Sequence, residues 1–175
     1  MVKVNNFHLV ELFHGKTWAF KDLPLATVGQ FLQYFLSKRK KNMTLLVGTS
    51  GDTGSAAIES VRSMENIDIV VMLPKGMCTK IQELQMTTVL DNNVHTFVVE
   101  GSSDDIDVIV KKCLTDSNYV AQHSLGSISS INWARIMGQV VHFFYGYLKL
   151  CENVGQTIQF VVPTGAMGHV TGKSF

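Results

Sequence analysis

The chain has little of what marks a disulfide framework, a metal site or a membrane span. Its 175 residues include three cysteines that lie far apart in the sequence: Cys78, Cys113 and Cys151. No C-x-x-C pair and no His/Cys ligand pattern occurs, so the sequence predicts neither a set of disulfides nor a bound metal. The most apolar run, residues 140–150, contains a histidine, a glycine and a lysine, and it is too short to cross a bilayer.

Charge of one sign is also scarce. The formal net charge is +1, and charged residues make up 17% of the chain. This gives no electrostatic reason to expect a nucleic acid or a membrane as a partner. The basic run Lys38–Lys41 falls at a predicted helix end, where cations suit the helix dipole. The first residues lack a secretory pattern, so we expect a cytoplasmic protein.

What the sequence does contain is a regular alternation of strand-like and helix-like segments. The apolar run Ile69–Leu73 is continuous, as is typical of a strand covered on both faces. The expected strands are residues 7–13, 44–48, 67–73, 94–99, 119–121 and 159–162, and the expected helices are residues 23–39, 53–64, 79–89, 103–114 and 131–150. This alternation predicts an α/β fold with a parallel sheet.

A lysine stands at an unfavourable place before the first expected helix. Asp22 is a suitable N-cap and Pro24 suits the first helical turn, so Lys21 would lie at the positive end of the helix dipole. One reason for a lysine there is chemistry, because a partly desolvated amine can form a Schiff base with an aldehyde. The alternative is a surface lysine paired with Asp22, and the local sequence fits both.

The segment Gly48–Gly54 follows an apolar strand and leads into a helix. Backbone N–H groups at such a turn suit an anion, for example the carboxylate of a substrate. The turn lacks the lysine of a phosphate-binding P-loop and the spacing G-x-G-x-x-G, so neither ATP nor NAD is predicted. The alternative is a tight turn capped by Asp52.

Two further segments combine polar groups with a helix start or a glycine turn. Ser130, Asn132 and Arg135 open a long expected helix, and a guanidinium with neighbouring hydroxyl and amide groups suits a phosphate. The alternative is helix capping, with Arg135 in a surface ion pair. Near the end of the chain, Phe160–Val162 leads into the glycine turn Gly165–Gly168, where backbone N–H groups would converge.

These four segments, in this order, resemble the threonine synthase family. The resemblance covers residues 7–168 and implies pyridoxal phosphate (PLP) as cofactor and fold type II, as in the β-subunit of tryptophan synthase. It further implies a small mobile domain at residues 43–121, with residues 1–42 and 122–175 in the large domain. Members of the family run to several hundred residues, so we expect residues 1–175 to represent a truncated fragment with incomplete sheet layers.

The resemblance assigns roles to individual residues. Lys21 would hold PLP through its amine and later move protons. Further cofactor contacts would come from Asp52, Thr53, Gly165, Ala166, Met167 and Gly168. The substrate carboxylate would be bound by Thr49, Ser50 and Gly51. The substrate phosphate would be bound by Ser130, Asn132 and Arg135.

The implied activity is that of a lyase acting on a small phosphorylated amino acid such as O-phosphohomoserine. Elimination of phosphate would be followed by hydrolysis to a 2-keto acid, or by water addition to give threonine. The residues after Gly168 depart from the family pattern, as in a splice product. We therefore keep as an alternative a non-catalytic truncated isoform acting as a binding or secreted cytokine-like protein. Uncovered apolar faces would favour self-association or a protein partner.

Overall fold

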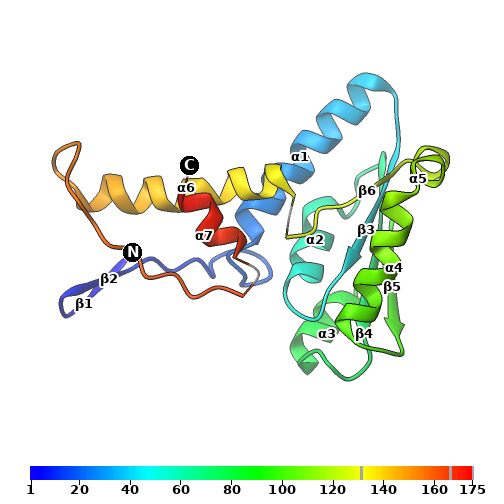
Figure 1. Cartoon of the computed structure of the whole chain (residues 1–175), viewed down its shortest axis with the longest axis horizontal. Helices are drawn as coiled ribbons and strands as arrows, with labels where there is room; N and C mark the ends of the chain where they lie inside the picture. The colour runs from blue at the N-terminus through cyan, green and yellow to red at the C-terminus, as the bar shows by residue number, and fades with distance from the viewer. Residues whose placement is uncertain (131, 166, 175) are drawn as a thin grey trace.

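The computed structural model describes residues 1–130, 132–165 and 167–174. A sheet with its helices forms one end of the molecule, and a long helix with an N-terminal hairpin forms the other (Figure 1). Ala166, which the sequence placed in the glycine turn, and Ile131, expected to begin a helix, lie outside the described residues.

Four parallel strands form the main sheet in the order β5-β4-β3-β6. Their bounds are β3 Met43–Gly48, β4 Ile67–Pro74, β5 Val94–Val99 and β6 Leu125–Gly126. Fully buried aliphatic residues on β3 and β4 form the centre of the core: Leu45, Val47, Ile67, Ile69, Val71 and Leu73. The prediction of an α/β fold with a parallel sheet is confirmed.

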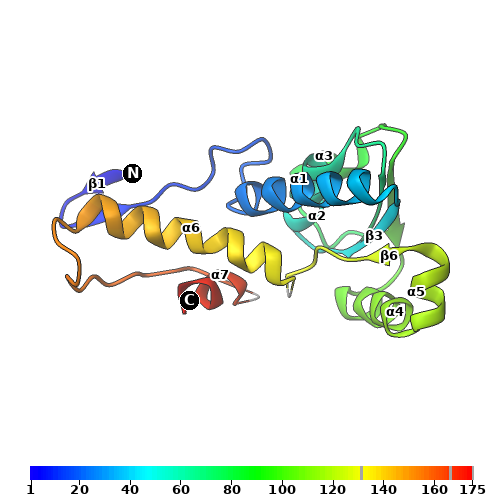
Figure 2. The same cartoon turned by 90° about the horizontal axis from the view of Figure 1, so that it is seen from above.

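Helices cover both faces of this sheet (Figure 2). Helix α4 (Ser103–Thr115) packs against β3 and β4 on one face, and α2 (Thr53–Val61) packs against the same strands on the other. Helix α3 (Lys80–Thr87) contacts α2, and α1 (Asp22–Arg39) packs on the outer side of α2. A side chain at Gly29 would start 2.2 Å from the Ser60 carbonyl oxygen, so the absence of one lets α1 approach α2 closely.

Helix α6 (Trp133–Leu150) extends away from the sheet and packs against α1 and the short helix α7 (Gly168–Lys173). Its apolar side chains on one side are largely exposed: Met137, Val141, Phe144 and Leu148. The N-terminal strands β1 (Val2–Val4) and β2 (Phe7–Leu9) form a separate antiparallel hairpin. The chain thus combines a well-packed sheet layer with a long helix that has one uncovered face.

Two strand predictions are wrong, and a third is confirmed only in part. Residues 119–121 lie within helix α5 (Ser117–His123), because the Asp116 side chain accepts hydrogen bonds from Asn118 N and Tyr119 N and starts a helix there. Residues 159–162 are irregular, since no described strand lies beside them to complete a ladder. Of residues 7–13 only 7–9 form a strand, and it belongs to the hairpin.

Candidate functional site

A cleft of about 320 Å³ opens where β3 ends. Strand β4 lies on one side of β3 and β6 on the other, so β3 marks the point where the strand order reverses. In open parallel sheets, ligands bind beyond the carboxyl ends of strands at such a point. Distant parts of the chain line the cleft: Phe20, Lys21, Gly48–Thr53, Asp107, Ser129, Ser130, Arg135, Gln139, Thr164, Gly165, Gly168 and His169. Most of the residues predicted from the sequence therefore meet at one place.

Lys21 is the N-cap residue of α1, and its side chain is 17% exposed. Its Nζ forms an ion pair with Asp52 and lies 5.4 Å from the centroid of the Phe20 ring. The alternative of a surface lysine paired with Asp22 is therefore wrong, because Lys21 points into the cleft toward a carboxylate from another segment. The amine is held at a site where a ligand can reach it.

Asp22 begins α1 but does not cap it. Its carboxylate instead accepts hydrogen bonds from the backbone N and the Oγ1 of Thr17. These bonds close the loop from residue 17 to residue 22, which we call the lysine segment. The predicted N-cap at Asp22 is wrong, and the aspartate fixes the backbone that presents Lys21.

Asp52 and its neighbours form the turn between β3 and α2. Asp52 is the N-cap residue of α2, but its side chain makes no capping bond and pairs with Lys21. Within the turn, Thr49 Oγ1 accepts a hydrogen bond from Gly51 N at 3.2 Å. Ser50 and Thr53 also line the cleft. The alternative that the Asp52 carboxylate caps α2 is therefore wrong, and Thr53, the first residue of α2, lines the same cleft.

Arg135 carries the least expected feature of the cleft. Arg135 is 3% exposed, and its Nη1 donates a hydrogen bond to Ile128 O at 3.3 Å. Its Nε has no hydrogen-bond partner among the described residues. Burial lowers the pKa of the guanidinium, and the nearby Asp52 carboxylate opposes that shift. Arginine nevertheless stays charged near neutral pH. The alternative of a surface ion pair is wrong: the cleft contains a buried cation with an unused donor.

Asn132 and Ser130 have different places at the start of α6. The Asn132 Oδ1 accepts from Arg135 N at 3.2 Å, and its Nδ2 donates to Ser127 O at 2.9 Å. These bonds make Asn132 the helix cap, and it does not line the cleft. Ser130 does line the cleft. For Asn132 the capping alternative accounts for the geometry, and its role in phosphate binding stays a prediction.

The glycine turn contributes Gly165 and Gly168 to the cleft wall, and Thr164, which precedes the turn, lines the same wall. Apart from its two neighbours in the chain, no described residue has an atom within 4 Å of the position where a side chain at Gly165 would start. A side chain at Gly168 would start 3.4 Å from the Ser130 carbonyl oxygen. Met167 has a φ of 60° and is 55% exposed, and it is not among the residues that line the cleft. The turn is open toward the cleft and close to the start of α6.

Sequence analysis missed several residues that line the cleft. Gln139 is 1% exposed and its Nε2 donates to Arg135 O at 3.1 Å. Its position four residues after Arg135 on one helix face was a usable signal. Asp107 approaches Gly48 from α4, and His169 directly follows the glycine turn. Neither position carries a local pattern, because both depend on how distant segments pack.

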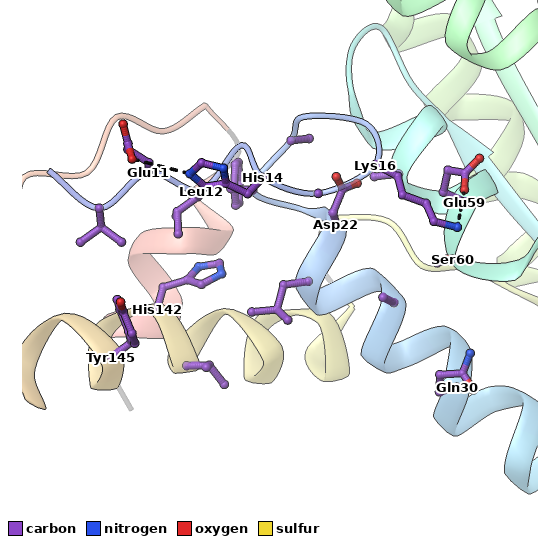
Figure 3. A pocket seen from close by; sticks show the side chains of 18 of the residues that line it. Glu11, Leu12, His14, Lys16, Asp22, Gln30, Glu59, Ser60, His142 and Tyr145 are labelled. Carbon is purple, nitrogen blue, oxygen red and sulfur yellow. Dashed lines mark ion pairs between the residues drawn. The ribbon is translucent and has the colours of Figure 1, made fainter. Parts of the chain in front are cut away.

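A second and larger cavity, of about 990 Å³, lies beside the lysine segment (Figure 3). Asp22 and Gln30 project into it from α1, and His142 and Tyr145 from α6. Two ion pairs lie along its wall, Glu11–His14 at 3.6 Å and Lys16–Glu59 at 3.4 Å, and Lys21 does not line it. The smaller cleft therefore carries the lysine and the unpaired arginine donor.

In the described part of the chain, no group of three His, Cys, Asp or Glu side chains is arranged to hold a metal ion. None of its helices combines the length and apolar character needed to cross a membrane.

Comparison with known proteins gives a consistent result. The family model for "Pyridoxal-phosphate dependent enzyme" matches residues 3–175. The chain is 54% identical over 170 residues to threonine synthase-like 2 of Homo sapiens, and 52% identical over 168 residues to that of Xenopus laevis. These matches cover 95% of this chain and 35% and 36% of the relatives, so the chain spans about a third of their length.

Solved structures agree with the sequence matches. The fold is similar to PLP-bound threonine synthase from Brucella melitensis, with a TM-score of 0.85 and 39% identity. The match covers 95% of this chain and 36% of that one. The fold of the described residues is thus similar to that part of a threonine synthase which the match covers.

Proposed function

Because the chain belongs to the family of pyridoxal-phosphate dependent enzymes, we propose that the cleft binds PLP at Lys21, together with a small amino acid that carries a phosphate group. O-phosphohomoserine is the substrate we infer. Phosphate elimination followed by hydrolysis would yield a 2-keto acid and ammonia, or water addition after the elimination would yield threonine. The observation that supports this most directly is Arg135, a buried cation that lines the same cleft as Lys21 and whose Nε has no hydrogen-bond partner among the described residues.

Three features of the cleft fit this cofactor and substrate. Lys21 provides a primary amine, the group that reacts with the aldehyde of the cofactor. The open space at Gly165 leaves room for a phosphate beside backbone N–H groups. Arg135 offers a charged donor in a desolvated place, where a bond to phosphate is stronger than in water. The residues present therefore suit a ligand with an aldehyde and a phosphate.

Each residue has a distinct role in this proposal. When bound, the cofactor supplies the electron sink that makes the Cα proton of an amino acid acidic. Lys21 Nζ would take and return that proton, and Asp52 would hold the Lys21 ammonium in the cleft when no ligand is present. Arg135 and Ser130 would bind the substrate phosphate, and Thr49, Ser50 and Gly51 would bind the substrate carboxylate.

The cleft also separates the two parts that we propose to move relative to each other. Residues 43–121 contribute the Thr49–Thr53 turn, and the flanking parts contribute Lys21, Arg135 and the glycine turn. The Lys21–Asp52 ion pair and a hydrogen bond from Gln85 Nε2 to Thr17 O, at 3.3 Å, join these parts. A ligand that replaces the ion pair would change how the two parts close.

The first experiment asks whether Lys21 binds the cofactor. The purified chain is mixed with PLP, the visible absorbance of lysine-bound cofactor is recorded, and borohydride reduction followed by peptide mapping locates the label. We expect the label at Lys21 and its loss in Lys21→Ala. Lys16→Ala is the matched control, because Lys16 lies five residues away and its side chain is 80% exposed. Equal labelling of both variants would contradict the proposal.

The second experiment asks whether Arg135 recognises phosphate. Binding of inorganic phosphate is measured by calorimetry for the wild type, for Arg135→Gln and for Arg39→Gln, a control at the far end of α1. We expect Arg135→Gln to weaken binding about tenfold or more, since a charge-assisted bond in a buried place is lost. Release of phosphate from O-phosphohomoserine then tests turnover. The signalling alternative gains no support from the described residues or from the comparisons.

A further inference from the structure

Two buried histidines from distant parts of the chain are hydrogen-bonded to each other. His142 Nδ1 lies 3.0 Å from His169 Nε2, and each residue is 8% exposed. His142 projects from α6 on the wall of the larger cavity (Figure 3), whereas His169 lines the cleft of the proposed site. The pair therefore connects the two cavities through the interior.

His169 also contacts the segment that presents Lys21. Its ring stacks on Phe20 with centroids 4.9 Å apart and planes 12° apart, and it meets Phe143 of α6 at 5.0 Å. Phe20 precedes Lys21, and Gly168 of the glycine turn precedes His169. One imidazole thus contacts the lysine segment and α6 while it is covalently attached to the glycine turn.

We propose that the His142–His169 pair positions Gly168 and the start of α7 against the lysine segment, and so fixes the wall of the cleft formed by the glycine turn. This inference rests on the proposed function for the identity of the ligand. The hydrogen bond orients the His169 ring, and the ring stacked on Phe20 sets the distance between the two walls. His142 is then a positioning residue, because it lines the larger cavity and acts on the cleft only through His169.

The pair holds this geometry best when both rings are neutral. One ring then donates an N–H and the other accepts it, whereas two charged rings would place donor against donor. Burial lowers the pKa of His142 from 6.5 to about 4, with the charge of His169 as the second cause, and burial also lowers the pKa of His169. Opening of the pair to solvent therefore becomes easier as the pH falls below 6.5.

Other ionisable groups surround the pair and are relevant to any pH effect. Glu11 and His14 come from the N-terminal segment, Asp22 from the start of α1 and Tyr145 from α6, and all four line the larger cavity with His142. Lys173 is the basic residue in the last turn of α7. Since these groups remain in every variant, a comparison of His142 variants isolates the contribution of the pair.

The first test measures amide hydrogen exchange of α7 in the protein without added ligand. His142→Asn keeps a donor and an acceptor near the Nδ1 position but cannot be charged, and His142→Leu leaves His169 Nε2 unpaired. Between pH 7.5 and 5.5 we expect α7 of the wild type to lose protection about tenfold, as the His142 shift implies. We expect a smaller loss in His142→Asn and low protection at both pH values in His142→Leu.

The second test measures PLP affinity of the same variants by the absorbance of lysine-bound cofactor. We expect His142→Leu to weaken PLP binding about tenfold at pH 7.5 and His142→Asn to restore most of it. Phe143→Leu removes the ring contact but keeps the hydrogen bond, and His123→Gln controls for loss of a histidine elsewhere. Equal α7 protection and equal PLP affinity in His142→Leu and the wild type would overturn the inference.

The two tests separate this inference from the proposed function. If the wild type binds no PLP, the proposed function fails, and the exchange measurement still decides whether the pair positions α7. If PLP binds at Lys21 but α7 exchange is independent of residue 142, the positioning role fails alone. If His142→Leu does not fold, the comparison of His142→Asn with the wild type across pH decides the outcome.

Discussion

The depressed pKa of His142 predicts a specific pH dependence of stability. In the unfolded chain His142 has the ordinary pKa of 6.5, whereas in the folded chain its pKa is about 4. The unfolded state therefore binds more protons between these values, and the free energy of unfolding falls as the pH falls. The stabilisation is fully present above pH 6.5 and is lost progressively toward pH 4.

The magnitude follows from the size of the shift. Between pH 7 and pH 5, the difference between 6.5 and about 4 corresponds to a loss of about 2 kcal/mol from His142 alone. This is roughly a twentyfold change in the folding equilibrium. His169 contributes in the same direction, because burial also lowers its pKa. A marginally stable domain has only about 5–15 kcal/mol in total, so the effect is large enough to measure.

Carboxylates with a lowered pKa do not account for a loss of stability between pH 7 and pH 5. The pKa of Asp91 is lowered by its hydrogen bond from Arg62, and that of Asp105 by hydrogen bonds from the backbone and side chain of Ser102. Such groups stabilise the fold above their ordinary pKa of 3.8 and lose that contribution only at lower pH. Between pH 5 and 7 the buried histidines are therefore the groups with a shift in the right range.

The assay is urea unfolding followed by circular dichroism at pH 5, 6 and 7 and constant ionic strength. Wild type and His142→Asn are compared, so that all other titrating groups cancel. We expect the free energy of unfolding of the wild type to fall by about 2 kcal/mol more than that of the variant between pH 7 and pH 5. Parallel curves for the two proteins would refute the reasoning.

Three further predictions concern packing, reactivity and association. Gly29→Ala should lower the melting temperature, with a loss of about 1–3 kcal/mol, since the new Cβ would start 2.2 Å from a backbone oxygen of α2; Gln30→Ala, at an exposed neighbour, should have little effect. Burial raises the pKa of the Cys78 thiol, so a variant with Cys78 as its one cysteine should react with a thiol reagent more slowly than a free thiol in a peptide near neutral pH. The exposed face of α6 should cause self-association that sedimentation velocity detects at rising concentration, and Phe144→Ser should reduce it; equal sedimentation of both proteins would contradict this.

The sheet could be predicted from sequence because its signal is local. Ile69–Leu73 and Leu45–Val47 are continuous apolar runs without an exposed residue, as expected for strands that helices cover on both faces. The helices that alternate with them have clear starts, such as the capping box of Thr79 with Gln82. By contrast, the apolar residues 159–162 form no strand, because strand formation also requires a neighbouring strand that local sequence does not reveal.

The partners of the site residues could not be predicted in the same way. Asp22 is next to Lys21 in sequence, yet the lysine pairs with Asp52, thirty-one residues away. The local aspartate is occupied by Thr17, and only the packing of α1 against α2 brings the second one into reach. Likewise, the burial of Arg135 depends on Ile128 and on contacts made by α6 as a whole. Residue type was visible in the sequence, but the pairing of charges was not.

The pairing of Lys21 with Asp52 also supports the proposal that the cleft binds an anion. Lys21 and Arg135 are both largely shielded from water, and the carboxylate that faces them is Asp52. Asp107 lies at the exposed rim, where solvent screens its charge. Two shielded cations facing one carboxylate leave an excess of positive charge, and an unpaired donor in such a place costs free energy until a ligand accepts its bond. A phosphate would remove both the charge excess and the unpaired donor, so the cleft should be more stable toward opening with phosphate bound than without it.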